Sequence, residues 1–248
     1  MRIITCGDAR FDDMKKLQKA AAEALEYNHT SYDLEDLEIP KELQEFVAVP
    51  RTPETSRQYF PRCPWKPRVI KEAMKENPDE IIVWMDTDAF PIRTFDEILR
   101  YDRWDMAVTT RPAEEKGVQY TAHPDWAGYI NAGVMFFRPR SITYQLLDLW
   151  LDTTLQQGNG DQAAITSLLR QMGSVLPGAQ LRRGEAVISC LPTWEYNNYY
   201  VEDPERYPHQ SGKKVKDIKI IHCKGADFTN SRHRRLYEQY APRLSSSP

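Results

Sequence analysis

Apolar and polar residues follow two different periods along this chain, and the order of the periods predicts the fold class. Short apolar runs rich in Ile and Val, typical of buried strands, alternate with longer segments in which apolar residues recur every three or four positions, as on one helix face. This order predicts an α/β fold with a mixed, mostly parallel central sheet flanked by helices. Strands are expected at residues 2–6, 32–34, 81–86, 106–110, 129–137, 186–191 and 218–223.

Helical spacing marks the segments between these strands. The clearest case is residues 11–27, where Met14, Ala21 and Leu25 share one face after an acidic start. Residues 40–67 are polar and punctuated by prolines, so they resist regular assignment, and a loop of that length is either functional or mobile. Further helices are expected at residues 67–76, 95–100, 142–155 and 161–172, with a polar loop at residues 111–126.

Length and composition favour one domain. The chain has 248 residues, of which 41% are hydrophobic and 28% charged, with a net charge of −3. We therefore expect a single domain at residues 1–244 and a disordered tail at residues 245–248. No segment reaches the roughly 18 apolar residues that a membrane helix needs, and residues 1–5 lead into a strand rather than a signal peptide, so a cytoplasmic location is expected. The four cysteines lack paired spacing, which predicts reduced thiols.

The apolar run that begins at residue 81 ends in two carboxylates, Asp86 and Asp88, separated by Thr87. Open α/β sheets bind ligands beyond the carboxyl ends of their strands. Two carboxylates in the turn that leaves a strand can reach one divalent cation, so the natural interpretation is a Mg²⁺ or Mn²⁺ site that bridges to a phosphate. The alternative is a structural turn, because short polar side chains commonly cap turns and helices.

Polar residues also stand at the ends of other expected elements. Asn131 opens a strand beside Ala132 and Gly133, which are too small to obstruct a ligand, although a turn that starts the strand is a rival explanation. Asp161 and Gln162 open a helix, where Asp161 could equally be a helix cap.

A histidine ends the last apolar run of the chain. His222 follows residues 218–221, and its neutral imidazole could join the two aspartates on a metal or simply be hydrogen-bonded. Lys224 and Gly225 then supply a charge and a bare backbone suited to a diphosphate.

Four motifs in this order and at these intervals resemble those of the GT-A class of nucleotide-sugar glycosyltransferases. The pattern is most similar to that of the retaining enzymes typified by glycogenin and the bacterial lipopolysaccharide galactosyltransferases. Each motif is weak alone, but the resemblance covers most of the chain and implies one Rossmann-like GT-A domain. The motifs are Asp86-Thr87-Asp88, Asn131-Ala132-Gly133-Val134, Gly160-Asp161-Gln162 and His222-Cys223-Lys224-Gly225.

The resemblance implies a role for each motif. His222 would join Asp86 and Asp88 on Mn²⁺ or Mg²⁺, and the donor would be a UDP-sugar. Asp161 would bind hydroxyls of the donor sugar, and Gln162 would lie near the anomeric carbon, opposite the leaving diphosphate. Attack from the front face, assisted by the leaving phosphate, would retain the anomeric configuration. If the enzyme inverted instead, the general base would have to be a carboxylate such as Asp125 or Glu195.

The nucleotide is expected at the end of the first strand. Thr5, Cys6 and Gly7 resemble the place where these enzymes hold base and ribose, largely through backbone groups, and Thr87 is assigned to the same ligand. Lys66 precedes a helix and suits a phosphate or base, although a lysine is more commonly solvated.

The acceptor is not identified by the sequence and could be a glycan, a lipid-linked sugar or nucleic acid. The aromatic segment at residues 194–200 could form a stacking wall or a buried β-rich insert. The basic run at residues 232–235, with the cations of residues 51–68, would suit a polyanion, but such a run is commonly a solvated helix face.

Three other classes fit the sequence less well. A haloacid-dehalogenase-like phosphatase also has two aspartates after an apolar strand, but Phe90 replaces the expected Thr or Val, and that motif normally opens the chain. A sugar-nucleotide nucleotidyltransferase would need a better glycine-rich phosphate loop than residues 7–10. A non-catalytic carbohydrate-binding protein would have little reason to hold Asp86, Asp88 and His222 together with Lys224.

Overall fold

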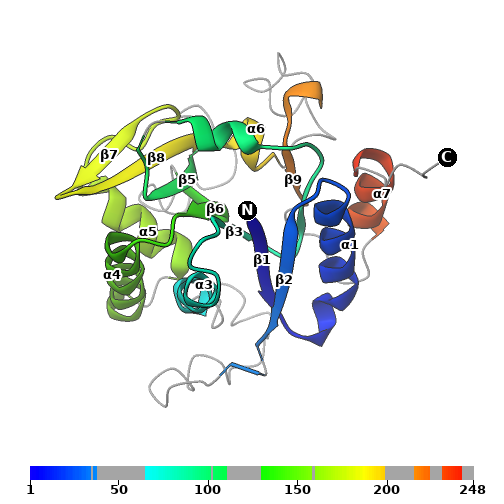
Figure 1. Cartoon of the computed structure of the whole chain (residues 1–248), viewed down its shortest axis with the longest axis horizontal. Coiled ribbons are helices and arrows are strands. Elements are labelled where there is room, and N and C mark those ends of the chain that lie inside the picture. The colour runs from blue at the N-terminus through cyan, green and yellow to red at the C-terminus, as the bar shows by residue number, and fades with distance from the viewer. Residues whose placement is uncertain are drawn as a thin grey trace.

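Strands and helices alternate along the chain, as the hydrophobic pattern predicts (Figure 1). The computed structural model describes residues 1–34, 36–37, 65–101, 103–110, 130–157, 160–198, 215–223 and 231–241. The strands are β1 (Arg2–Gly7), β2 (Asn28–Asp33), β3 (Ile82–Met85), β4 (Ala89–Pro91), β5 (Met106–Thr110), β6 (Ile130–Phe137), β7 (Gln180–Arg183), β8 (Ala186–Pro192) and β9 (Ile220–His222). The α-helices are α1 (Asp12–Glu23), α3 (Trp65–Glu76), α4 (Ser141–Gln157), α5 (Asp161–Arg170), α6 (Thr193–Tyr196) and α7 (Ser231–Tyr240), and the 3₁₀ helices are η1 (Ala9–Phe11), η3 (Asp96–Arg100) and η6 (Val215–Asp217).

The described residues form a seven-stranded sheet in the order β2-β1-β3-β6-β5-β8-β7. Strands β1, β2, β3, β5 and β8 run in one direction, whereas β6 and β7 run against them. This arrangement confirms the mixed, mostly parallel sheet. Because β6 is antiparallel, its first residues lie beside the last residues of its neighbours: Val134 is opposite Met85, and Asn131 is opposite Thr109. The Asn131 motif and the Asp86 motif therefore meet at one edge of the sheet.

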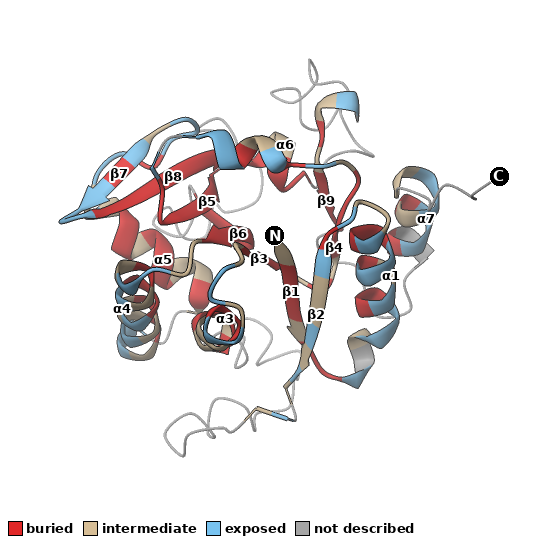
Figure 2. Ribbon diagram, in the orientation of Figure 1, coloured by how far each residue is buried: buried red, intermediate tan, exposed pale blue. Residues whose placement is uncertain are grey.

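Helices cover both faces of the sheet. Successive strand residues face opposite sides, so Ile82 and Trp84 pack with α3, α4 and α5, while Val83 and Met85 pack in a second core with α1, η3 and α6. Figure 2 shows the result, with buried strands at the centre and exposed outer surfaces on α1 and α4. Because both faces are covered, β3 and β6 read as continuous apolar runs rather than alternating ones.

A small second sheet, β4-β9, lies beside the large one. The two strands are antiparallel, with His222 opposite Ala89, and the amide of Cys223 donates a hydrogen bond of 2.7 Å to the carbonyl of Asp88. Phe90 of β4 packs edge-on against His233 of α7, with ring centroids 5.5 Å apart. Strand β4 has only three residues, and the hydrophobic pattern does not predict it. Its pairing brings the end of β9 to the carboxylate motif.

Several elements differ from the expected ones. The pattern predicts a strand at residues 32–34, but β2 begins at Asn28, because an edge strand with an exposed face can be polar and still pair along its length with β1. Helix α3 begins at Trp65, within the stretch that resisted assignment. The helix expected at residues 95–100 is the 3₁₀ helix η3, and α6 is a short helix instead of a β-rich insert. Strand β7 was not predicted.

Residues 40–64 of the irregular stretch expected at residues 40–67, the loop expected at residues 111–126 and the tail at residues 245–248 lie outside the described residues. None of the helices in the described part of the chain combines the length and the apolar character needed to cross a membrane.

A polar relay connects the edge strand β2 to the turn after β3. His29 Nε2 lies 2.9 Å from Gln18 Oε1. The buried Gln18 amide in turn donates to the carbonyl oxygens of Asp86, at 2.9 Å, and Ala89, at 2.7 Å. Both carbonyl groups belong to the turn that carries the two aspartates. The side-chain amide of Gln18, on α1, therefore fixes the backbone of that turn.

This relay predicts a pH-dependent loss of stability. Burial, assisted by the charge of Lys19, lowers the pKa of His29 from 6.5 to about 4, so the folded protein keeps this ring neutral where the unfolded chain binds a proton. Stability should therefore fall as the pH drops from 6.5 to about 4. We expect a loss of about 1 to 3 kcal/mol from this residue. Denaturant unfolding of the wild type and His29→Gln across this range measures it, and parallel stability curves would contradict the assignment.

Candidate functional site

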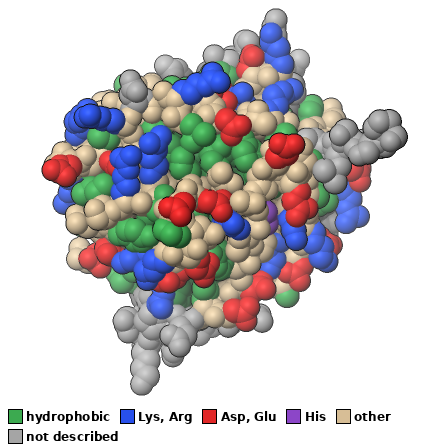
Figure 3. Space-filling model, in the orientation of Figure 1, with side chains coloured by type: hydrophobic (Ala, Val, Ile, Leu, Met, Phe, Trp, Pro, Cys, Tyr) green, Lys and Arg blue, Asp and Glu red, His purple; other side chains and the backbone are tan. Residues whose placement is uncertain are grey.

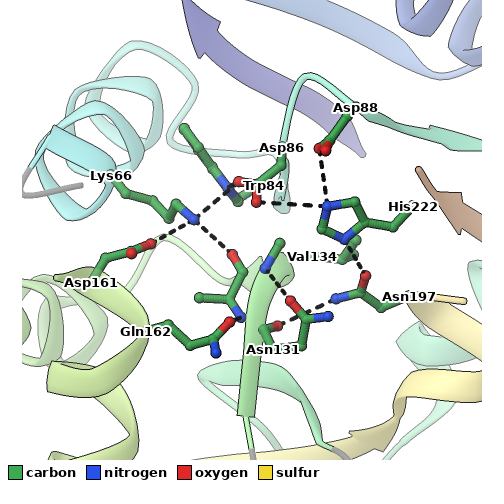
Figure 4. A network of polar contacts seen from close by, with 12 residues as sticks. Lys66, Trp84, Asp86, Asp88, Asn131, Val134, Asp161, Gln162, Asn197 and His222 are labelled. Atoms are coloured by element: carbon green, nitrogen blue, oxygen red, sulfur yellow. Dashed lines mark hydrogen bonds and ion pairs between the residues drawn. The ribbon is translucent and has the colours of Figure 1, made fainter. Parts of the chain in front are cut away.

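Two carboxylates and one imidazole meet where β3, β4 and β9 end or begin. Asp86 and Asp88 occupy the turn between β3 and β4, and His222 is the last residue of β9. His222 Nε2 lies 3.0 Å from an Asp88 oxygen and 4.0 Å from an Asp86 oxygen, and one atom of each residue lies within 4.8 Å of the others (Figure 4). Two oxygen ligands with one nitrogen ligand suit Mn²⁺ or Mg²⁺. These residues could therefore hold one divalent cation.

The missing side chain of Gly133 makes room for His222. A Cβ atom built on Gly133 would lie 2.3 Å from Cε1 of the His222 ring and 2.6 Å from its Nδ1. The same atom would lie 3.1 Å from a carboxylate oxygen of Asp86. Glycine is required here by space, because the imidazole rests directly on the backbone of β6.

A partly buried lysine lies between two of the predicted site residues. Lys66, in the first turn of α3, has its ammonium 3.0 Å from Asp86 Oδ1 and 2.6 Å from Asp161 Oδ2, and it donates to the carbonyl of Ala132 at 3.0 Å. It also lies over the ring of Trp84, 5.3 Å from the centroid. Lys66 thus joins the expected metal ligands to the residues expected to hold the sugar (Figure 4).

The charges around Asp86 favour its ionised form. Burial alone would raise the pKa of this carboxyl group, but the charge of Lys66 and hydrogen bonds from Trp84 and Lys66 oppose it, and the pKa is lowered. The Trp84 indole donates at 2.9 Å to Asp86 Oδ1. A carboxylate that stays ionised is the form that binds a metal.

The start of α5 lies against the start of β6. Asp161 is the first residue of α5 and only 6% exposed, and the N-cap position belongs to Gly160, so Asp161 is not the helix cap. The Trp150 indole of α4 donates to its carbonyl oxygen at 2.8 Å. Gln162 Oε1 lies 3.4 Å from the amide of Ala132. The structure therefore brings Asp161 and Gln162 to the same edge as Asp86, Asp88 and His222.

Asn131 is buried at the same edge. Its Oδ1 accepts a hydrogen bond of 3.1 Å from the amide of Gly133. Within the part of the chain that the structure describes, its amide nitrogen has no hydrogen-bond partner. Asn131 therefore has a donor to spare next to Asp161 and Gln162.

The expected nucleotide-binding segment, Thr5, Cys6 and Gly7, ends β1. A Cβ atom on Gly7 would lie 3.1 Å from the methyl group of Thr87, so the two segments touch. Thr5 is fully buried, whereas Cys6 is partly exposed. The buried Lys15 lies 3.4 Å from the carbonyl of Gly7, a cation that sequence reasoning missed.

Three of the expected residues, Lys224, Gly225 and Asp125, lie outside the described residues. Glu195, the other proposed base for inversion, lies in α6, where its carbonyl accepts a hydrogen bond of 2.8 Å from the amide of Lys219.

Sequence reasoning also missed the partner of His222. Asn197 follows α6 and is fully buried, and its Oδ1 lies 2.7 Å from His222 Nδ1. No local signal marks Asn197, because its partner is 25 residues away in the sequence. Trp84 had such a signal, since it stands two residues before Asp86 and shares its side of the strand.

Comparison with solved structures identifies the fold. A glycosyltransferase involved in glycosylation of the major capsid of PBCV-1 aligns with a TM-score of 0.55 and 13% identity, covering 96% of this chain and 98% of that one. The galactosyltransferase LgtC, solved with donor and acceptor sugar analogues, gives 0.56 and 13% over 100% of this chain and 98% of its own. GlyE of Streptococcus pneumoniae TIGR4 gives 0.55 and 12% over 97% of this chain and 59% of its own.

Comparison of sequences identifies the family. No curated protein matches the chain. The family model described as nucleotide-diphospho-sugar transferase matches residues 53–236, which is well over half of the sequence. The match confirms the resemblance inferred from the four motifs, and the solved neighbours confirm the expected α/β architecture. The chain therefore belongs to the nucleotide-diphospho-sugar transferase family, as a glycosyltransferase of the GT-A type.

Proposed function

We propose that this protein is a metal-dependent glycosyltransferase that moves a sugar from a UDP-sugar to an acceptor hydroxyl with retention of configuration. One observation carries the proposal: the candidate metal triad and the pair Asp161 and Gln162 lie at one edge of the sheet, joined by Lys66. This is the arrangement needed to hold a diphosphate and its sugar side by side. The neighbour LgtC, which was solved with donor and acceptor sugar analogues, supports the assignment.

Asp86, Asp88 and His222 would hold Mn²⁺, or Mg²⁺ in its place. When bound, the cation would neutralise negative charge on the departing nucleoside diphosphate. The chain itself adds Lys66, whose ammonium keeps a positive charge between the two carboxylates. Lys224 and Gly225 are proposed to contact the same diphosphate. Preorganised charge of this kind stabilises a leaving group without reorganisation during the reaction.

The residues at the start of α5 and β6 are proposed to orient the sugar. Asp161 would accept hydrogen bonds from sugar hydroxyls, and the spare amide of Asn131 would donate one. Gln162 would lie near the anomeric carbon. The acceptor oxygen would attack that carbon as its bond to the phosphate oxygen breaks, and the acceptor proton would pass to the leaving phosphate.

The nucleoside is proposed to lie against Thr5, Cys6 and Gly7, with Thr87 close by. The donor is proposed to be a UDP-sugar, as the family resemblance implies. We also propose a cytoplasmic location.

The acceptor is proposed to be a glycan or a lipid-linked sugar rather than nucleic acid. His233 of the basic run is 1% exposed and packs on Phe90, while Arg234 and Arg235 are exposed. Acidic and basic side chains are interspersed on the face shown in Figure 3. With a net charge of −3, this distribution does not favour a general polyanion acceptor.

The proposal predicts slow, metal-dependent hydrolysis of the donor. With Mn²⁺ and a panel of nucleotide sugars, we expect free UDP from a UDP-sugar, and loss of that activity in Asp88→Asn. Asp148→Asn on α4, whose side chain is 54% exposed in an ion pair with Lys71, is the matched control. Preference for a GDP-sugar would refute the donor assignment. Pyrophosphate formed from a sugar phosphate and a nucleoside triphosphate would indicate a nucleotidyltransferase.

The close contact between Gly133 and the His222 ring predicts that adding a methyl group at Gly133 lowers both metal affinity and stability. Gly133→Ala should displace the ring and lower Mn²⁺ affinity by about 10-fold or more, measured by calorimetry without nucleotide. Overpacking should also cost about 1 to 3 kcal/mol of stability. In the His222→Ala background the same change should cost much less stability, because the ring is gone and the 3.1 Å approach to Asp86 remains. An equal cost in both backgrounds would contradict the proposed contact.

The sugar assignment predicts that Gln162→Ala lowers turnover much more than UDP affinity. We expect a drop of about 10- to 100-fold in turnover, because only groups engaged more strongly in the transition state control the chemical step. Gln157→Ala, at an exposed position of α4, is the control. Full turnover in Gln162→Ala, or an inverted anomeric product by NMR, would favour an inverting mechanism with Asp125 or Glu195.

A further inference from the structure

The ring nitrogen of His222 that points away from the carboxylates ends a buried chain of hydrogen bonds. His222 Nδ1 lies 2.7 Å from Asn197 Oδ1. The Asn197 amide nitrogen lies 2.7 Å from the hydroxyl of Thr109 and 3.3 Å from the carbonyl of Asn131. The Thr109 hydroxyl lies 2.7 Å from the same Asn131 carbonyl. All four residues are at most 2% exposed, so each group has to find its partner within the protein.

The donor and the acceptor of each hydrogen bond follow from the backbone carbonyl groups with which this series of hydrogen bonds ends. A carbonyl oxygen can only accept, so the Thr109 hydroxyl donates its single proton to Asn131 or, at 3.2 Å, to Val134. The hydroxyl must then accept from Asn197, which places the NH₂ group of that amide toward Thr109. The amide oxygen is left facing His222, and it can only accept. His222 therefore carries a proton on Nδ1.

We propose that Asn197 is a positioning residue that fixes the tautomer of His222 for the metal, an inference that rests on the proposed metal-dependent function. A neutral imidazole with its proton on Nδ1 has its lone pair on Nε2, the atom that faces Asp86 and Asp88. Thr109 acts one step further away, by keeping the amide of Asn197 from turning over. Metal-binding histidines generally need such a partner on their second nitrogen.

The backbone holds Asn197 and His222 in fixed relation. The amide of Asn197 donates to the carbonyl of Thr193 at 2.9 Å, which ties it to α6. The next residue, Asn198, donates to Ile220 at 2.9 Å and accepts from the amide of His222 at 2.8 Å. His222 and Asn197 thus lie in two segments that backbone hydrogen bonds hold together. An amide is also suited to this place because it adds no negative charge next to Asp86 and Asp88.

Three variants test the proposal. Asn197→Leu removes the acceptor, and Asn197→Asp keeps one. Thr109→Val removes the shorter of the two contacts that hold the NH₂ group and leaves the 3.3 Å contact to the carbonyl of Asn131. Thr110→Val is the matched control, because this neighbour on β5 is equally buried and donates to Leu191 instead, at 3.1 Å. The readouts are calorimetry with Mn²⁺ alone and ¹⁵N NMR of the His222 ring in metal-free protein at alkaline pH, with thermal unfolding as a check on the fold.

We expect Mn²⁺ affinity to fall by about 10- to 100-fold in Asn197→Leu, to fall less in Thr109→Val, and to be largely kept in Asn197→Asp and Thr110→Val. NMR should show the proton on Nδ1 in the wild type. If Asn197→Leu does not fold, the NMR of the wild-type ring decides the question. Unchanged affinity in folded Asn197→Leu, or a wild-type proton on Nε2, would overturn the inference. Absence of Mn²⁺ binding by the wild type, with the proton on Nδ1, would instead contradict the proposed function.

Discussion

The contact between the His222 ring and the bare backbone at Gly133 is the constraint on which the site depends. The imidazole would collide with any side chain at this position, since a Cβ atom would lie 2.3 Å from it. The contact arises because β6 runs against its neighbours and so begins where β3 ends. The pairing of β4 with β9 then lays His222 on this backbone, directly beside Asp88. Strands of both sheets thus position the candidate ligands.

Among the described residues, Lys66 is central to the electrostatic balance of the site. Lys66 lies between Asp86 and Asp161, two carboxylates from distant parts of the sequence, and its side chain is only 11% exposed. Removing one partner from a buried charge group leaves the others uncompensated, so these residues act as a unit. The same unit joins the residues proposed to hold the metal to those proposed to hold the sugar. A donor whose diphosphate and sugar are adjacent would contact both groups at once.

Much of the fold and of the candidate site could be predicted from the sequence, for identifiable reasons. Strands β3, β5 and β6 are buried along their length, so they are mostly apolar and easily recognised. Residues Asp86, Asp88 and His222 were found because their motifs stand at strand ends, and the structure brings them together as expected. Strand β2 was misplaced because an edge strand can be polar, and β4 was missed because three residues carry no period.

The residues that hydrogen-bond or pair with the site residues could not be predicted in the same way. Asn197 and Thr109 lie in segments with no motif, and only the folded chain places them behind His222. Lys66 was expected to contact a ligand, but its bonds to Asp86 and Asp161 depend on how α3 and α5 meet β6. Local patterns identify groups that face a ligand, whereas the groups that orient them are set by packing between distant segments.

Anomalous diffraction from crystals grown with Mn²⁺ would test the central claim most directly. The account predicts one Mn²⁺ bound by oxygens of Asp86 and Asp88 and by Nε2 of His222, with Asn197 still on Nδ1. Manganese bound at another place, or bound by the two aspartates with His222 turned away, would contradict it.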